Sequence, residues 1–114
     1  MEDCIFCRIA RGEIPSQRVD ETARVLAFRD IQPQAPTHVL LIPREHVASS
    51  AAEVGSAHAV LMGELFELAA RIAKREGLEH GWRLVTNVGP DAGQSVPHLH
   101  FHLLGGRAMR WPPG

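Results

Sequence analysis

The sequence has little cysteine and few aromatic residues: two cysteines, no tyrosine, four phenylalanines and two tryptophans. Two cysteines are too few for the disulfide framework that stabilises small secreted domains. The longest strongly apolar run, residues 39–42, is far too short to span a bilayer, and residues 1–4 have neither the basic nor the apolar region of a signal peptide. We therefore expect a cytoplasmic protein with no membrane partner.

The sequence also has no excess of charge of either sign. Twelve basic and thirteen acidic residues give a net charge of -1, so we expect no broad basic surface for nucleic acid. With 114 residues, of which 45% are hydrophobic and 22% charged, the chain fits one globular domain over residues 1–114. These numbers leave room for a ligand of nucleotide size.

Apolar spacing and turn residues predict two helices and five strands. The long helix is the clearest, because Leu61, Leu65, Leu68 and Ile72 recur at spacings of four, three and four. Asp3 is placed to cap the short helix. Short turns between most strands indicate an α+β fold with an antiparallel sheet. The predicted helices cover residues 4–11 and 56–76, and the predicted strands cover residues 18–21, 25–29, 38–42, 82–88 and 98–104.

The strongest chemical signal is the segment 98–103, in which histidine and apolar residues alternate. On a strand the rings of His98, His100 and His102 share one face and the apolar side chains share the other. Such a face can be merely solvated, although imidazole is a costly choice for that. Alternatively the three rings hold a catalytic zinc, or one ring is a nucleophile whose neighbours fix its tautomer.

The segment just before the histidines, residues 87–97, is rich in glycine and neutral polar residues. Glycines let backbone N–H groups approach an anion closely, and Asn87, Gln94 and Ser95 supply neutral donors and acceptors. This composition suits a phosphate, while the alternative is an ordinary turn between two strands.

Cys4 and Cys7 have a spacing that suits metal ligands, but a tetrahedral zinc site needs two further donors from elsewhere. The pair can also be a structural remnant without metal, or a redox motif, for which the surrounding βαβ unit is missing. His38 by itself reads as a satisfied core histidine. We interpret His58 and His80 as solvated.

The pattern of residues 98–104, His-φ-His-φ-His-φ-φ with φ apolar, resembles the histidine triad family, and the likeness to its Hint branch covers nearly the whole chain. The resemblance implies a HIT-like fold, paired through the long helix and an edge strand into a ten-stranded sheet in a homodimer. The tail, residues 107–114, would reach the partner's site; docking of Met109 and Trp111 on their own protomer is the alternative. Other matching segments are residues 5–6, 13–15, 28–31, 33–38, 93–96, 105–107 and 111–114.

The resemblance also implies hydrolysis of purine nucleoside phosphoramidates and acyl-nucleotides, such as adenosine 5'-phosphoramidate and AMP-lysine, to a nucleoside monophosphate of the AMP or GMP type. His100 would attack phosphorus and form a nucleotidyl-histidine, with its Nδ1–H held by the His98 carbonyl. Ser95 and His102 would stabilise phosphoryl charge, and His38 would support the triad. No organic cofactor is expected. The alternatives are a non-catalytic nucleotide-binding or scaffolding module, and a zinc metallohydrolase that uses the three triad rings.

By the same resemblance, Asp30 would bind the ribose hydroxyls, and Asn87 and Gly93 the sugar and phosphate. A structural zinc would lie between Cys4, Cys7, His46 and His98, although His46 alone would ordinarily be a surface histidine. The nucleotide site would be completed by an apolar slot of Phe6, Ile9, Phe28 and Ile31, by Arg29 where relatives carry a histidine, and by Gln94, Ser95, His100 and His102. Without the resemblance, Phe6 and Phe28 read equally well as core residues.

Overall fold

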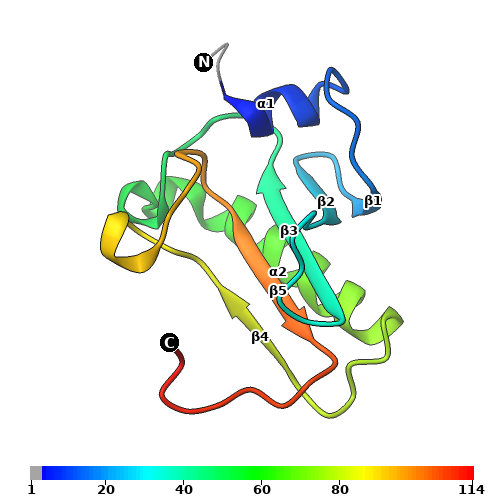
Figure 1. The fold of residues 1–114 in the computed structure, drawn as a ribbon. Helices are drawn as coiled ribbons and strands as arrows, with labels where there is room; N and C mark the ends of the chain where they lie inside the picture. Colours follow the sequence, from blue (N-terminus) through cyan, green and yellow to red (C-terminus); the bar gives the residue numbers. More distant parts are fainter. Residues whose placement is uncertain (1–3) are drawn as a thin grey trace.

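The computed structural model describes residues 4–114, which form a five-stranded antiparallel sheet with one long and one short helix (Figure 1). The strand order is β1-β2-β3-β5-β4, which confirms the predicted α+β class. The elements are α1 (Ile5–Ala10), β1 (Arg18–Glu21), β2 (Val25–Arg29), β3 (Thr37–Pro43), α2 (Ala59–Arg75), β4 (Trp82–Val85) and β5 (Phe101–Gly105). Within residues 4–114, neither helix has the length and apolar character that crossing a bilayer requires.

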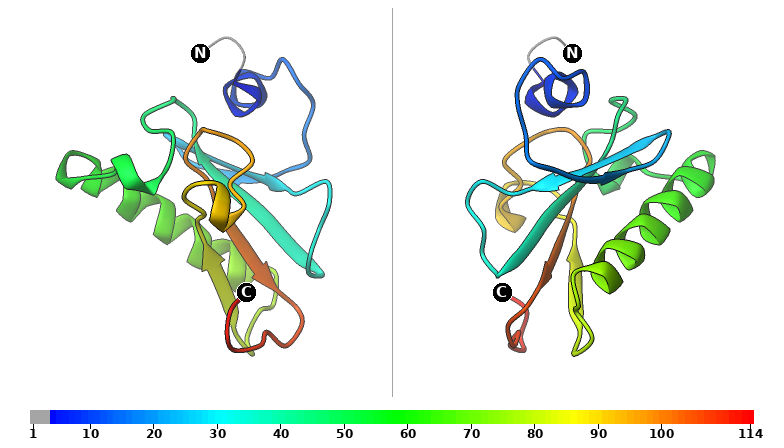
Figure 2. Two further views of the ribbon diagram at one scale, coloured as in Figure 1. Left: turned by 60° about the vertical axis from the view of Figure 1, so that its left-hand side comes forward. Right: turned by 90° about the vertical axis from the view of Figure 1, so that its right-hand side faces the viewer.

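The helix α2 covers one face of the sheet (Figure 2). Its apolar stripe packs on the residues of β2, β3 and β5 that point to that side, so the predicted helical face is confirmed. Leu65, Leu68 and Ile72 are at most 1% exposed. The central strand β3 is buried along its whole length because layers cover both of its faces.

The short helix α1 lies over the opposite face, near one end of the sheet. Its residues Phe6 and Ile9 pack with side chains of β2 and β3 in a second apolar cluster that contains Leu26, Phe28, Leu40 and Ile42. The N-cap is Cys4, whose Sγ accepts a hydrogen bond from the Cys7 N–H at 3.3 Å. The predicted cap, Asp3, lies outside the described residues.

The two strands nearest the triad, β4 and β5, are shorter than predicted. β4 ends at Val85 and β5 begins only at Phe101, so His98 and His100 precede the strand. The reason is that the neighbouring groups bond elsewhere: the Pro43 carbonyl accepts from the His98 ring, and the Leu99 N–H donates to Ala48 O at 2.9 Å. The alternation nevertheless persists, because the apolar residues at 99, 101 and 103 all lie in the core under α2.

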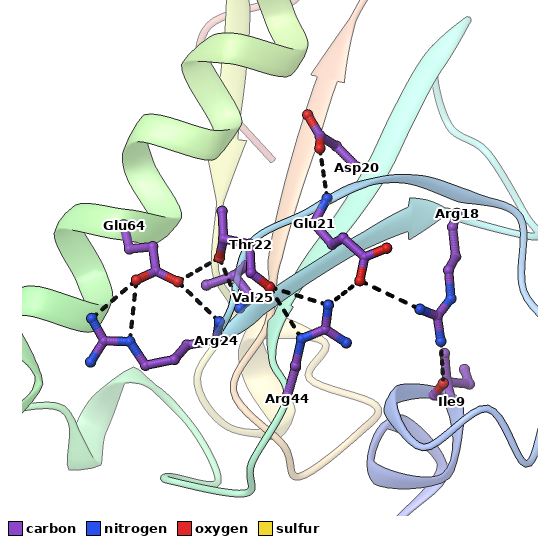
Figure 3. Close-up of polar contacts among 9 residues, drawn as sticks. All are labelled: Ile9, Arg18, Asp20, Glu21, Thr22, Arg24, Val25, Arg44 and Glu64. Carbon is purple, nitrogen blue, oxygen red and sulfur yellow. Dashed lines mark hydrogen bonds and ion pairs between the residues drawn. The ribbon is translucent and has the colours of Figure 1, made fainter.

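A chain of polar contacts ties both helices to the hairpin between β1 and β2 (Figure 3). On α2, Glu64 accepts from the Thr22 hydroxyl at 2.5 Å, and Arg44 donates to Thr22 O at 3.2 Å. At the other end, Arg18 donates to Ile9 O on α1 at 3.5 Å. Of these contacts, the one from Arg18 joins α1 to β1 and adds to the apolar packing of Phe6 and Ile9.

Candidate active site

His100 is buried, only 5% exposed, and its tautomer follows from one hydrogen bond. Its Nδ1 lies 2.7 Å from the His98 carbonyl oxygen, which can only accept, so Nδ1 carries the proton and Nε2 keeps a lone pair. Burial lowers the pKa of His100, although the bond to His98 O and the Asp30 charge act in the opposite direction. The ring is therefore neutral near pH 7, which is the form that acts as a nucleophile.

His102 has the complementary tautomer, which is set by the main chain through His38. The Gln34 N–H donates to His38 Nδ1 at 2.9 Å, so the proton of neutral His38 is on Nε2. This Nε2 lies 2.9 Å from His102 Nδ1 and donates to it, which leaves the proton of His102 on its Nε2. Burial, together with the neighbouring His100 and His38, lowers the pKa of His102 to about 4. The site thus places a neutral donor ring beside a neutral ring with a free lone pair.

Asp30 directly follows β2 and lies next to His38. Its Oδ2 lies 3.3 Å from His38 Nε2, while its Oδ1 accepts from the Gln32 N–H at 2.8 Å. One possible metal-ligand atom from each of Asp30, His38 and His102 lies within 4.8 Å of the others. These three residues do not fit a metal ion. The Gln34 N–H donates to Nδ1 of neutral His38, so the ring proton is on Nε2. Nε2 is the atom that would have to bind the ion.

A cavity of about 390 Å³ opens beside the triad between α1 and the end of β2. The Phe6 ring forms one wall and meets the His100 ring edge to face, with centroids 5.0 Å apart. Leu40, another wall residue, pairs with His102 in the β3–β5 register. The lining includes six of the residues predicted to hold the nucleoside, Phe6, Ile9, Phe28, Arg29, Asp30 and Ile31, but not Asn87.

Two of these lining residues differ in character from the rest. The Arg29 guanidinium pairs with Glu76 beyond the end of α2, at 2.7 and 3.0 Å, and this pairing lowers the pKa of Glu76. Ile31 is 95% exposed at the rim of the cavity. A contact of either side chain with a base stays a prediction.

The side-chain amide of Gln94 stabilises the loop between β4 and β5 through hydrogen bonds to main-chain atoms. Its Oε1 accepts from the Gly89 N–H at 3.0 Å, and its Nε2 donates to Ser49 O at 2.8 Å. Gly93 takes φ +82°, a conformation that favours glycine. Ser95 is exposed, Asn87 is half-buried, and no hydrogen bond among residues 4–114 joins either to a triad ring. Their roles at the phosphate and sugar stay predictions.

His98 does not line the cavity, and its ring lies against the two cysteines at the start of α1. Its Nε2 donates to Pro43 O at 2.8 Å, which leaves Nδ1 with a lone pair 3.1 Å from Cys4 Sγ and 3.5 Å from Cys7 Sγ. His46 Nδ1 lies 3.8 Å from Cys7 Sγ, and one donor atom from each of the four residues lies within 4.8 Å of the others. Burial raises the pKa of Cys7, and the neighbouring Cys4 raises it further.

These four residues fit a tetrahedral zinc ion. Bond lengths of about 2.3 Å to sulfur and 2.0–2.1 Å to nitrogen separate neighbouring donors by roughly 3.4–3.8 Å, close to the separations present here. The three triad rings, in contrast, form no such group within residues 4–114, because their nitrogens point to different partners. This geometry speaks against a catalytic zinc on His98, His100 and His102.

Sequence reasoning missed several residues that shape the site. The Gln34 amide and the Pro43 carbonyl act through the backbone, which residue type does not reveal. Leu40 could have been found, since it is two residues from His38 on the same face of a strand. Thr86, whose hydroxyl donates to His100 O at 2.8 Å, gave no sequence signal.

Comparison with known proteins identifies the family of this chain. The HIT domain family matches residues 11–109. A 14 kDa zinc-binding protein of Zea mays is 52% identical over 96% of this chain and 87% of its own length. Arabidopsis thaliana adenylylsulfatase HINT1 is 49% identical over 96% of this chain and 76% of its own length.

Among solved structures, a HIT family hydrolase from Legionella pneumophila superposes with a TM-score of 0.94 at 51% identity, over 98% of this chain and all of that one. A HIT family hydrolase from Clostridium thermocellum superposes with a TM-score of 0.91 at 43% identity, over 96% of each chain. With a family match over most of its length and relatives of about half identical sequence, this chain belongs to the HIT domain family.

Proposed function

We propose that this protein hydrolyses purine nucleoside phosphoramidates and acyl-nucleotides to a nucleoside monophosphate. The observation that carries the proposal is the pair of complementary imidazoles: Nε2 of His100 has a lone pair, and Nε2 of the neighbouring His102 has a proton. The Phe6-lined cavity beside them has room for a nucleoside. The relative named adenylylsulfatase supports a substrate in which a nucleotide α-phosphorus bears a leaving group.

The reaction proceeds in two displacements. His100 Nε2 attacks the α-phosphorus, and the bond from phosphorus to the leaving nitrogen or oxygen breaks as that atom takes a proton from the site. Water then attacks the nucleotidyl-histidine, returns a proton to the site and releases the monophosphate. His102 Nε2–H stabilises the charge on the phosphoryl oxygens, and we assign the proton transfer to the leaving atom to Ser95.

The nucleoside is held by the cavity walls and by Asp30. Phe6 and Phe28 lie edge to face with centroids 5.8 Å apart, so they offer aromatic surface to a purine ring. Asp30, at the boundary between cavity and triad, accepts from the ribose hydroxyls. In this arrangement Asn87 and Gly93 contact the sugar and phosphate from the loop opposite.

A structural zinc is proposed at Cys4, Cys7, His46 and His98. When bound, zinc would supply a cross-link between α1 and the sheet, which couples metal binding to folding. Phe6 lies between the two cysteines in sequence, so the same short helix carries both the metal ligands and a wall of the nucleotide cavity. Chemistry at His100 needs no metal.

A homodimer with a ten-stranded sheet is proposed through the β4 edge. The other edge strand, β1, carries a register shift and places Asp20 in ion pairs with Arg71 and Arg75, features that oppose strand addition. β4 has an unpaired edge and a half-exposed Trp82. Trp111 in the tail is 83% exposed, which supports a tail that reaches for the partner.

The test is to mix the purified protein with adenosine 5'-phosphoramidate, quench early and search by mass spectrometry for an adenylyl group on His100. We expect AMP release and the adduct in the natural protein, and neither in His100→Ala, which should still bind AMP. A folded protein that binds AMP but gives no adduct and no AMP release would support the non-catalytic nucleotide-binding module instead. Turnover retained in His100→Ala would point to another nucleophile.

A further inference from the structure

The main chain of His100, the proposed nucleophile, lies just before the first paired residues of β5. The last paired residues of β4 and β5 are Val85 and His102, and the last pair of β3 and β5 is Leu41 with Phe101. His100 therefore precedes the regular ladder on both sides. Its position depends on contacts outside the sheet, and a shift of about 1 Å in a reacting group can cost a hundredfold in rate.

Thr86 reaches across this gap. It directly follows β4, it is half-buried, and its hydroxyl donates to the His100 carbonyl oxygen at 2.8 Å. The contact thus replaces, with a side chain, the kind of support that a strand neighbour would give through its backbone. The next residue, Asn87, begins the loop that leads to Gly93 and Ser95, so Thr86 joins the nucleophile to the phosphate side of the site.

The other contacts of this segment do not hold the same atom. The Leu99 N–H donates to Ala48 O, and the His100 ring bonds back to His98 O. Both restrain the chain before the His100 carbonyl. Loss of the Thr86 hydroxyl would remove a donor from a carbonyl of a residue that is 5% exposed, and the segment would shift to find another partner.

We propose that Thr86 is a positioning residue for the reaction: its hydroxyl holds the His100 main chain so that Nε2 faces the bound phosphate. This proposal rests on the proposed role of His100 as nucleophile. Thr86 does not touch the substrate, so its effect falls on the chemical step rather than on nucleotide binding.

The experiment compares Thr86→Val, which keeps the shape but removes the hydroxyl, with Thr86→Ser, which keeps the hydroxyl. A matched control is Thr37→Val, which removes a threonine hydroxyl that lies 3.4 Å from Glu76. With adenosine 5'-phosphoramidate we expect Thr86→Val to lower kcat about tenfold to a hundredfold, with KM and the Kd for AMP within about twofold. Thr86→Ser should recover kcat to within about threefold, and Thr37→Val should leave kcat unchanged.

An unchanged kcat in folded Thr86→Val, or an equal loss of kcat in Thr86→Ser, would overturn the proposal. If Thr86→Val and Thr86→Ala both fail to fold while Thr86→Ser is normal, the residue is structural only and the proposal also fails. A second measurement is independent of turnover: the hydrogen-bonded Nδ1–H of His100, followed by nitrogen-15 NMR, should be sharp in the natural protein and Thr86→Ser but broadened in Thr86→Val. If the natural protein shows no turnover, the proposed hydrolysis fails, while this signal still decides whether the Thr86 hydroxyl holds His100 in place.

Discussion

The depressed pKa of His102 predicts how stability depends on pH. The pKa of this histidine is about 4 in the folded protein, against 6.5 as its ordinary value in an unfolded chain. Below pH 6.5 the unfolded chain binds a proton that the folded chain does not, so the free energy of unfolding falls as pH falls. Between pH 8 and pH 5 this single group removes about 2 kcal/mol, and the loss continues until pH approaches 4.

The assay is urea denaturation at a series of pH values, with a chelator present so that bound metal does not contribute. His102→Gln removes the titrating ring. Between pH 8 and pH 5, the free energy of unfolding of the natural protein should therefore fall by about 2 kcal/mol more than that of this variant. Burial lowers the pKa of His38, His98 and His100 as well, so the natural protein should lose more than His102 alone explains. Leu104→Val, a change on the same strand without a titratable group, should give a curve parallel to that of the natural protein.

Parallel curves for the natural protein and His102→Gln would refute this reasoning. They would show that the His102 ring takes up its proton equally in the folded and unfolded chains. The assignment of its Nε2–H as a fixed neutral donor would then fail, because that assignment needs a ring that stays neutral in the folded protein at pH 5.

Three further predictions concern the metal, the dimer and the packing at the end of β5. Zinc added to the metal-free protein should raise the thermal midpoint and bind one ion per chain by elemental analysis, while Cys7→Ser should abolish both effects. Trp82→Glu should convert a dimer to a monomer in sedimentation, and a natural protein that already sediments as a monomer would refute the β4 interface. Gly105→Ala should cost about 1–3 kcal/mol in urea denaturation, since its Cβ would lie 2.6 Å from Leu78 Cδ1. Adding Leu78→Ala to Gly105→Ala should relieve that clash. A Gly105→Ala protein as stable as the natural one would contradict this prediction.

Much of the fold could be predicted from local sequence patterns because those patterns report burial directly. The spacing of Leu61, Leu65, Leu68 and Ile72 identified the long helix and its buried face. The alternation in residues 98–103 separated rings from apolar side chains correctly, even where the chain is not a regular strand. The alternation persists in an irregular segment because each side chain still lies either in the core or on the opposite face of the sheet.

The strand ends could not be predicted in this way. The strand expected over residues 82–88 ends at Val85, and the one expected over residues 98–104 begins at Phe101. Both limits depend on whether a partner backbone is free to pair. That depends on bonds such as His98 to Pro43 O, which join residues far apart in sequence.

The sequence by itself determined which chemistry is available: three imidazoles in alternation, a cysteine pair with metal spacing and a loop suited to an anion. Only the tertiary structure decided what each ring does. His98 turns towards the cysteines, while His100 bonds back to a carbonyl and His102 accepts from His38. The physical reason is that an imidazole is nucleophile, donor or metal ligand according to the partner of its other nitrogen, and here those partners come from β3, from the His98 carbonyl before β5 and from the start of α1.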